Sequence, residues 1–486
     1  MIREFVKNDS IRDIGVFRKF ALRAMMFAMV LFVNQFALSA DNDTNNTNST
    51  NNTNNTNNSE TTTVVPSSGW VMQEAIGGVM IDANGILANA PQGVLKRSRD
   101  FLISNAQTIE QEYKQSTELR KISLKKLDLE IKRCSEYGEP LNDSVRYLGG
   151  LTSIRYVVAV PEENDIILIG PAEAWKIDSS SAVVGAKSGR PVMQLEDLIT
   201  LMRAWNNPRP EVITCSIDPT PEAMMKVMAL QRNFNPRANI AEYVRQLEVA
   251  YGLNTVTLHG VPDDSRIARV LTAADFRLKQ TGLEHAGAPK GFKSYVSMLT
   301  STSNSTMNPR FWLAPEYGEI SHDVDRLTWD LGKSNVKTLT ETDLFDSRGQ
   351  RTVTGKVDLQ AKKWADMMTR RYAELCKVEP VFADLQNCME LSMAVAVIYK
   401  ENLMSKTKCK PDSLWERNAI ILPHHRVPKQ VKSVGTTIQR STSVVVGCGG
   451  VEINPWKKLE STVLKEDLSK ERGKLLARAS DNWCSN

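Results

Sequence analysis

The sequence lacks the short motifs that identify the common enzyme classes. It contains no Gly-x-x-x-x-Gly-Lys phosphate loop, no Gly-x-Gly-x-x-Gly dinucleotide fingerprint and no Gly-x-Ser-x-Gly nucleophile elbow. The chain has 7 cysteines but no Cys-x-x-Cys pair, the spacing that often marks zinc or redox sites. No motif therefore indicates a cofactor, and nucleotide binding is not expected.

A strong excess of one charge is also missing. The 486 residues carry 61 Lys and Arg against 56 Asp and Glu, a formal net charge of +5. Proteins that bind nucleic acid usually show a strongly basic domain or face, so no nucleic-acid partner is expected. The C-terminal segment 406–486 is locally basic. It could attract an anionic lipid, polymer or protein, or it could simply be a soluble basic domain.

Long hydrophobic runs are scarce, and the clearest one is close to the N-terminus. Basic residues precede an apolar run at 24–40, and the small residues Ala37, Ser39 and Ala40 suit a signal peptidase. The run is shorter than the roughly twenty residues that a spanning helix needs. We therefore predict a signal peptide at 1–40, export to the periplasm, the cell envelope or the medium, and no further transmembrane span. The alternative is an uncleaved signal that tethers the chain to the membrane.

Residues 41–68 are a low-complexity segment in which Asn and Thr predominate. Such a segment has too little apolar surface to repay the entropy lost on ordering. We predict a disordered tether here, followed by folded sequence from residue 69.

The folded sequence predicts an α+β protein with a mixed β-sheet and packed helices, plus a small β unit and an α-helical hairpin. Apolar strands at 155–160 and 165–170 form a predicted hairpin, and helices alternate with strands after it. A charged stretch at 94–136 is interpreted as two packed helical pieces. The expected divisions are a main α+β domain at 69–299, a β unit with a helical hairpin at 300–405, and the basic segment at 406–486. Further predicted helices are 194–205, 221–234, 240–251, 358–376 and 380–403.

Residues 253–282 are the most regular stretch, a strand, a tight turn and an amphipathic helix. The carboxylate of Asp263 or Asp264 is expected to cap the helix. Apolar residues at helical spacing leave Arg266, Arg269 and Arg277 on the predicted outer side of the helix. This basic face could dock an acidic partner or could simply be solvated.

The turn before this helix holds the candidate catalytic residues His259, Asp263, Asp264 and Ser265. A histidine base beside a carboxylate and a hydroxyl could serve acyl transfer. The structural alternative is that an aspartate caps the helix, Ser265 lies in its first turn and His259 ends the strand.

A second group, His322, Asp323 and Asp325, offers candidate metal ligands, since imidazole and carboxylates bind zinc and similar ions. His259 could supply a further ligand. The structural alternative is a solvated turn, because Asp is a common turn residue. His424 and His425 are interpreted as an exposed loop.

Two further groups have weaker chemical interpretations. The loop at 187–189 resembles a phosphate cradle only distantly. Cys448 lies among glycines that would let a substrate approach a thiolate, but it could equally be buried or disulfide-bonded. Cys215 and Cys388 are interpreted as buried small hydrophobic residues. For the cysteines as a whole, one or two disulfides near the C-terminus and fully free thiols are both compatible with the sequence.

Several ordered segments together resemble a known family. They include GGVMIDANGIL, IRYVVAVPEENDIILIGPAEAWKID, HGVPDDSRIARVLTAADFRLK and KWADMMTRRYAELCKVEPVFADLQN. In this order they are similar to an exported bacterial family of planctomycete type that is named only as domain of unknown function 1598. The resemblance extends over about residues 70–405. It implies export and a shared fold, and it assigns no catalytic residue, substrate or cofactor.

The sequence thus favours an exported cell-envelope protein that binds or scaffolds a partner without catalysis. The expected partner is a protein or an envelope polymer. The alternative is an exported hydrolase that uses the turn after His259, with or without a metal ion.

Overall fold

The computed structural model describes residues 75–486 apart from 83–84, 207–210, 234–238, 284–286, 300–307, 417–418, 433–434, 438–443, 447 and 478–481. All described residues belong to one unit, Val64–Asn486. The whole segment before residue 75, including the predicted signal peptide and the predicted tether, lies outside the described residues.

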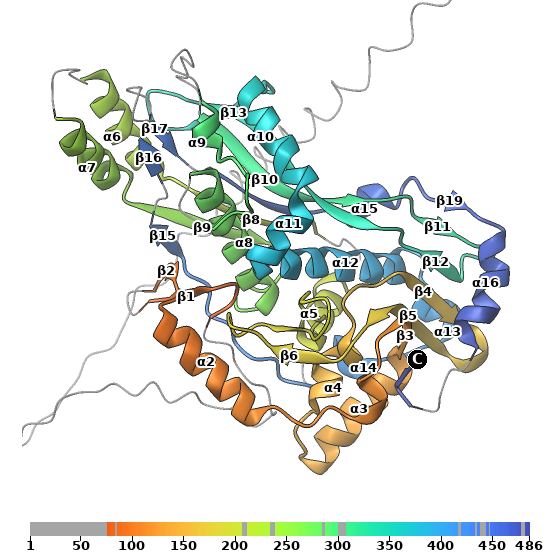
Figure 1. Cartoon of the computed structure of the whole chain (residues 1–486). Coiled ribbons are helices and arrows are strands. Elements are labelled where there is room, and N and C mark those ends of the chain that lie inside the picture. Colours follow the sequence, from red (N-terminus) through yellow and green to blue (C-terminus); the bar gives the residue numbers. More distant parts are fainter. Residues whose placement is uncertain are drawn as a thin grey trace, which may run out of the picture. The chain divides into compact units, whose positions relative to one another are not determined.

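Two large β-sheets organise the described residues (Figure 1). The first has nine described strands in the order β1-β2-β15-β9-β8-β18-β10-β13-β14. Their bounds are Val79–Ile81, Ile86–Asn89, Gln430–Lys432, Leu253–His259, Ile213–Asp218, Cys448–Ile453, Asn308–Tyr317, Ser334–Phe345 and Arg351–Val353. The pairs β15–β2 and β10–β18 are parallel, whereas the other neighbours are antiparallel. The predicted α+β class with a mixed sheet is therefore confirmed.

The second sheet has seven described strands in the order β19-β11-β12-β4-β5-β3-β20. Their bounds are Val463–Leu464, Ser321–His322, Thr328–Asp330, Tyr156–Val160, Asp165–Ala172, Thr117–Ser123 and Cys484–Ser485. The predicted hairpin is confirmed as β4 and β5, which pair from Tyr156↔Ile169 to Val160↔Asp165. Two short hairpins, β6–β7 (Trp175–Ile177 and Val183–Gly185) and β16–β17 (Gly435–Thr437 and Val444–Val446), form small separate sheets.

The charged stretch at 94–136 contains a strand that the helical interpretation missed. Its two helices are α2 (Gln92–Asn105) and α3 (Leu124–Tyr137), and β3 lies directly before α3. β3 pairs with β5 and β20 on its two sides, and its buried Arg120 and Lys121 side chains donate to the main-chain oxygens of Gly149 at 3.0 Å and Asn486 at 2.9 Å. Sheet pairing therefore overrides the helical preference of these charged residues.

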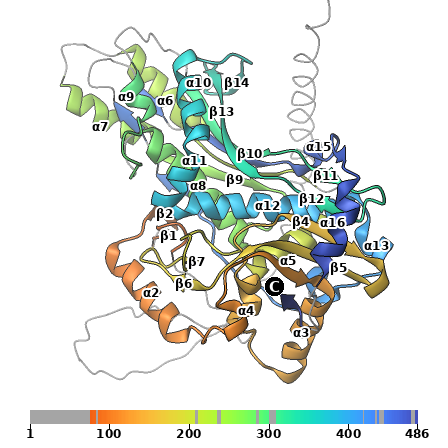
Figure 2. The same ribbon diagram turned by 45° about the vertical axis from the view of Figure 1, so that its right-hand side comes forward.

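Three helices form the centre of the molecule, α5 (Leu195–Trp205), α8 (Arg266–Gly282) and α12 (Pro380–Lys400). They contact one another, and α12 also contacts β13 of the first sheet and β4 of the second. Figures 1 and 2 both show α12 running between the two large sheets. By length and composition α12 could cross a membrane, but 94% of its apolar window is buried inside this protein. Here it is a core helix.

The predicted helix at 358–376 is divided at Arg371 into α10 (Leu359–Arg370) and α11 (Tyr372–Val378). α11 packs against α12, as expected for a helical hairpin. Strands from the segment 300–405 lie in both large sheets. The remaining helices are α4 (Asp143–Arg146), α9 (Tyr295–Met298), α13 (Leu403–Thr407), α14 (Asp412–Trp415), α15 (Pro455–Lys458) and α16 (Asp467–Leu476).

The connection between β8 and β9 forms a helical arm, α6 (Pro221–Arg232) and α7 (Ile240–Tyr251). Met224 and Val227 of α6 pack against Tyr243 and Leu247 of α7 in a small hydrophobic cluster of their own. Both views show the arm at one end of the described unit, beyond the central helices. The arm is therefore stabilised mainly by its own contacts.

We expect Leu271→Ala to lower the free energy of unfolding by about 2–5 kcal/mol, because this substitution leaves a cavity in a packed core. Leu271 lies in α8 and is 0% exposed, whereas Leu359 in α10 is 65% exposed. Leu359→Ala is the matched control and should change the free energy by about 0.5 kcal/mol or less. Denaturant titration of both variants measures the difference. Similar losses in the two variants would show that α8 is not in the core.

Candidate functional site

The turn between β9 and α8 is a structural cap in which Ser265 has the central role. Its Oγ accepts a hydrogen bond from the Ala268 amide at 3.2 Å and donates one to the Pro262 carbonyl at 2.7 Å. Ser265 is the N-cap of α8, so the prediction that Asp263 or Asp264 caps this helix is wrong. With both hydrogen bonds made and the residue buried, Ser265 has no free hydroxyl proton for nucleophilic attack.

Neither aspartate of the turn caps the helix. Asp264 Oδ2 lies 2.6 Å from His424 Nδ1, and the Asp264 carbonyl accepts a hydrogen bond from the His425 amide at 2.6 Å. Asp263 and His259 are exposed. Across the described part of the chain, the side chains of these two residues make no hydrogen bond or ion pair. The four candidate catalytic residues therefore share a turn but do not form a hydrogen-bonded triad.

The candidate metal ligands lie in the turn between β11 and β12. His322 Nδ1 donates to the Asp323 carbonyl at 2.7 Å, and its Nε2 accepts from Arg326 Nη1 at 3.0 Å. This pairing places the ring proton on Nδ1. Asp323 Oδ1 accepts from the amides of Leu327 and Thr328, as in a capped turn.

Both His322 nitrogens and one Asp323 oxygen are thus already in use, and the guanidinium beside His322 opposes a cation. Asp325 is exposed in the same turn. Among the described residues, no group of three or more His, Cys, Asp or Glu side chains has an arrangement that could hold a metal ion. His259 ends β9 of the other large sheet and joins no such group among the described residues.

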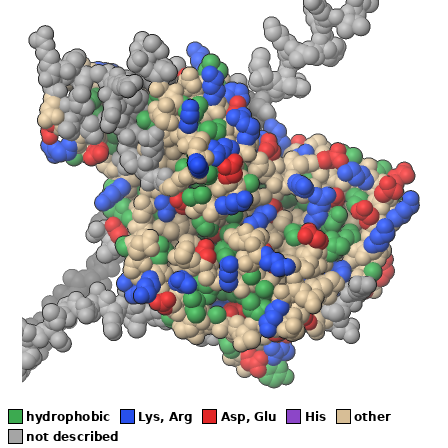
Figure 3. All heavy atoms as spheres, in the orientation of Figure 1, with side chains coloured by type: hydrophobic (Ala, Val, Ile, Leu, Met, Phe, Trp, Pro, Cys, Tyr) green, Lys and Arg blue, Asp and Glu red, His purple; other side chains and the backbone are tan. Residues whose placement is uncertain are grey.

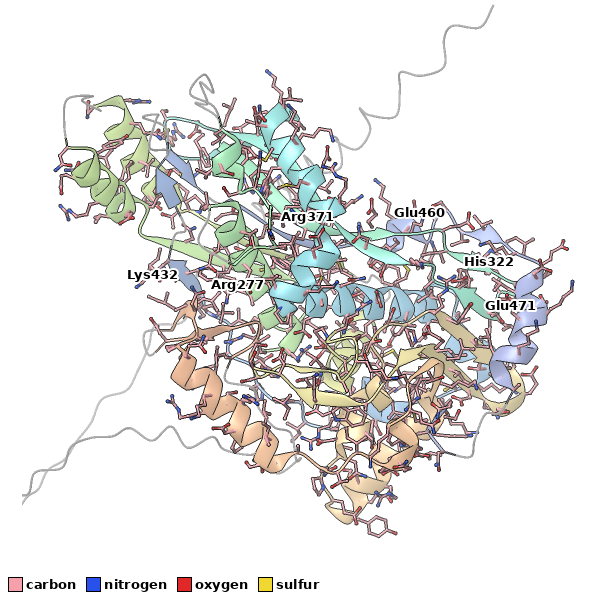
Figure 4. All side chains as sticks on the ribbon, in the orientation of Figure 1. Arg277, His322, Arg371, Lys432, Glu460 and Glu471 are labelled. Carbon is pink, nitrogen blue, oxygen red and sulfur yellow. The ribbon has the colours of Figure 1, made fainter. Side chains whose placement is uncertain are left out.

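The arginines of α8 are buried, which corrects the prediction of a basic outer face. Arg266, Arg269 and Arg277 are 6%, 5% and 9% exposed. Two segments distant in sequence cover them, the β1–β2 hairpin and the chain around Arg426. Figure 4 labels Arg277 on α8 and shows it in a different part of the molecule from His322.

Main-chain carbonyl groups of the covering segments accept hydrogen bonds from these arginines. Arg269 donates to the Arg426 carbonyl at 2.9 Å, and Arg277 donates to the Gly78 carbonyl at 3.1 Å and to Asn89 Oδ1 at 3.0 Å. Burial lowers the pKa of Arg269 to about 10. The guanidinium groups therefore fasten the β1–β2 hairpin and the 426 segment onto the core helix.

Arg266 lies at the centre of a buried ion-pair cluster that the sequence did not reveal. Its Nη1 contacts Asp197 Oδ2 at 2.5 Å, its Nη2 contacts Asp384 Oδ1 at 2.8 Å, and its Nε lies 3.9 Å from Glu196 Oε1. Glu196 also contacts His425 Nε2 at 2.8 Å. The cluster joins the first turns of α5 and α8 to α12 and to the 425 loop. His425 is only 4% exposed, so the prediction that it belongs to an exposed loop is wrong.

The carboxylates outnumber the arginine in this cluster. Burial raises the pKa of Asp197 to about 7, with Arg266 opposing the rise and Glu196 and Asp384 adding to it. A small pocket beside the cluster is lined by Arg266, Asp384, Ser180, Ala182, Val183, Ala75 and Gly77. The main physical effect of the cluster is to hold three helices together.

The loop at 187–189 is an anion cradle, but the protein fills it with its own carboxylate. Glu173 accepts hydrogen bonds from the amides of Lys187 at 2.7 Å and Ser188 at 3.1 Å, and also from the Ser188 hydroxyl. A Cβ added at Gly185 would lie 2.1 Å from Glu173 Oε1, so this glycine lets the carboxylate enter. The distant resemblance to a phosphate loop therefore reflects an internal structural contact.

No disulfide forms among the six described cysteine side chains, Cys134, Cys215, Cys376, Cys388, Cys409 and Cys484, and five of these side chains are buried. The interpretation of Cys215 and Cys388 as buried residues is confirmed. Burial raises the pKa of Cys376, Cys409 and Cys484 to about 12, which keeps these thiols protonated and unreactive at neutral pH. The Cys448 side chain lies outside the described residues.

Comparison with known families gives one match, to a protein of unknown function (DUF1598), over residues 215–295. This segment is similar to DUF1598. The match confirms the family resemblance and assigns it to the stretch that runs from β8 through the helical arm to α8. Comparisons with curated proteins and with solved structures gave no match.

The DUF1598 segment contains Arg266 and Ser265 but none of the acidic partners of Arg266. Glu196, Asp197 and Asp384 all lie outside residues 215–295. The DUF1598 stretch therefore supplies the cation, and flanking parts of this chain supply the carboxylates that make its burial possible.

We expect Ser265→Ala to lower the free energy of unfolding by about 1 kcal/mol, because the α8 amides lose their cap. Asp263→Ala should have almost no effect, since the Asp263 side chain is exposed and makes no described contact. Thermal and denaturant unfolding of the two variants test this assignment. A larger loss for Asp263→Ala than for Ser265→Ala would contradict it.

We expect Arg266→Leu to lower the free energy of unfolding by about 3–5 kcal/mol near neutral pH, because buried carboxylates lose their counter-ion. The loss should be smaller at about pH 5 than at about pH 8. A carboxyl group whose folded pKa is raised stabilises the fold while it is protonated, and this contribution is lost as the pH rises through that pKa. Unfolding measured at both pH values gives the comparison.

Arg245→Leu is the control for this experiment, because Arg245 pairs with Glu242 on the exposed side of α7. It should change stability little at either pH. A loss for Arg266→Leu that is equally large at both pH values would show that the cluster carboxylates do not respond to the missing charge.

Proposed function

We propose that this chain is an exported bacterial protein of the cell envelope that binds or scaffolds a partner without catalysing a reaction. Export is supported by the basic residues and the apolar run at 24–40, which have the order of a secretory signal. The Asn- and Thr-rich segment 41–68 would then separate the folded part from the signal, or from the membrane if the signal is not cleaved.

The hydrogen bonds of the Ser265 hydroxyl are the main support for a function without catalysis. A nucleophile needs a free hydroxyl near a base, but the Ser265 hydroxyl is buried and donates to the Pro262 carbonyl. The other polar groups of this region are also engaged in contacts that position helices, with Asp264 against His424 and Glu196 against His425. These groups are therefore better suited to fixing a rigid binding surface than to proton transfer in a reaction.

The alternative proposal, an exported hydrolase, retains His259 as its base. The exposed position of His259 at the end of β9 leaves the ring accessible to a substrate. Ser265 would have to be replaced as nucleophile by an activated water. His259→Ala tests this alternative, since it should abolish any hydrolysis that the purified protein shows and leave partner binding unchanged.

Native mass spectrometry of the protein isolated from its own envelope tests the main proposal. We expect a mature chain that begins near residue 41 and that carries a partner subunit or polymer. Crosslinking in intact envelopes before isolation controls for loss of a weak partner. A partner-free monomer after crosslinking would contradict the binding function, and a bound metal or small ligand would favour the hydrolase.

A further inference from the structure

Five cations on one surface form no ion pair with any residue that the structure describes. They lie on α10, α11 and the loop 287–293, all are exposed, and their side chains make no hydrogen bond or ion pair with the rest of the described chain. We refer to Lys290, Lys293, Lys363, Arg370 and Lys377 as the basic row. Figure 3 shows Lys and Arg side chains gathered over α10 and α11.

The two acidic side chains within α10 and α11 are already paired with other cations. Asp366 contacts Lys362 at 3.1 Å, and Glu374 contacts Arg371 at 2.6 Å. The hydrogen bond from Arg371 lowers the pKa of Glu374, and the charge of Lys377 contributes to the same shift. The surface therefore keeps an excess of positive charge after every local pair is counted.

The helices and the loop hold the basic row in a defined geometry. Lys363, Arg370 and Lys377 follow one another at intervals of seven residues. α10 ends at Arg370 and α11 begins at Tyr372, so Lys363 and Arg370 share α10, whereas Lys377 lies on the helix that follows. Side chains seven residues apart on a helix lie on one face, about 10 Å from each other along its axis.

The loop is fixed against the same helices. Trp364 Nε1 donates to the Lys293 carbonyl at 3.1 Å, and Arg371 Nη2 donates to the Lys290 carbonyl at 2.9 Å. Figure 4 labels Arg371 between α10 and α11 at this surface. Lys290 and Lys293 therefore lie beside the helical cations on a rigid support.

We propose that the basic row binds a linear polymer with repeated carboxylate groups, such as an acidic polysaccharide. This inference rests on the proposed binding function and names the chemistry of the partner. A row of exposed cations on adjoining elements matches the repeated charges of an extended polyanion. The strength of such binding is mainly electrostatic, so it decreases steeply with salt.

The composition of the surface favours a polymer over a membrane or a folded protein. Among the described residues of α10, α11 and their flanking turns, exposed large apolar side chains lie near the two ends of the row, at Val357, Leu359 and Val378. Membrane-surface helices bury a continuous apolar face between their cations. Protein interfaces usually have an apolar or aromatic centre. The described basic row has neither feature.

The test measures binding of the full mature chain to alginate, a polyuronate, at low salt and at about 0.3 M salt, where charges are strongly screened. The triple variant Lys363→Gln, Arg370→Gln and Lys377→Gln should bind about tenfold or more weakly, because three exposed ion pairs are lost. Neutral dextran should not bind. Circular dichroism and the unfolding midpoint should match the wild type, since these side chains are exposed.

The matched control is the triple variant Lys96→Gln, Lys114→Gln and Lys474→Gln, which removes the same charge from exposed positions on other elements. It should bind alginate nearly as the wild type does. An equal loss in both triple variants would show that binding depends on net charge alone, and it would overturn the basic row as a site. Full binding by the first triple variant would also overturn the basic row as a site.

Vesicles of phosphatidylcholine with phosphatidylglycerol distinguish a membrane partner. Vesicle binding that depends on the basic row, without alginate binding, would overturn the polymer assignment. If the wild type and the first triple variant capture a protein partner from envelopes equally, the polymer assignment is also overturned. The proposed binding function would then remain intact. Alginate binding through the basic row by a chain that captures nothing in envelopes would instead refute the proposed function alone.

Discussion

The contact between Arg266 and its three carboxylates is the constraint on which the centre of this structure depends. A buried guanidinium is tolerated only where acidic groups compensate it with good geometry. Asp197, Asp384 and Glu196 come from α5 and α12, so the charge of one α8 residue fixes the relative positions of three helices. Apolar packing alone would tolerate small rotations of these helices, whereas the hydrogen-bonded pairs select one arrangement.

Elements with clear periodicity could be predicted from the sequence. The β4–β5 hairpin, β9 and α7 lie where apolar alternation or helical spacing indicates them. The spacing of apolar residues also located α8 but gave the wrong environment for its arginines. Their burial depends on carbonyl groups of Gly78 and Arg426, which are far from α8 in sequence and carry no signal in its pattern.

The same limit applies to the candidate site. The turn at residues 259–265 could be located from the sequence. Which of its residues caps the helix could not be predicted, because Asp and Ser are both good helix caps. The backbone places Ser265 in the capping position and turns Asp264 toward His424. Adjacent acidic residues at the start of α5 were the sole local sign of the Arg266 cluster. Their partners in α8 and α12 become neighbours only after folding.

The arginine contacts to the β1–β2 hairpin determine how force would pass through the molecule. This hairpin is the first described element of the chain, and it lies at the edge of the nine-stranded sheet, where only β15 supports it from within. Tension on the preceding segment would act on the carbonyl groups of Gly78 and Val79 and through them on Arg277 and Arg269. Because both arginines belong to α8, the load would be carried by the central helix, and the chain could resist pulling from its N-terminal side without first peeling a strand from the sheet.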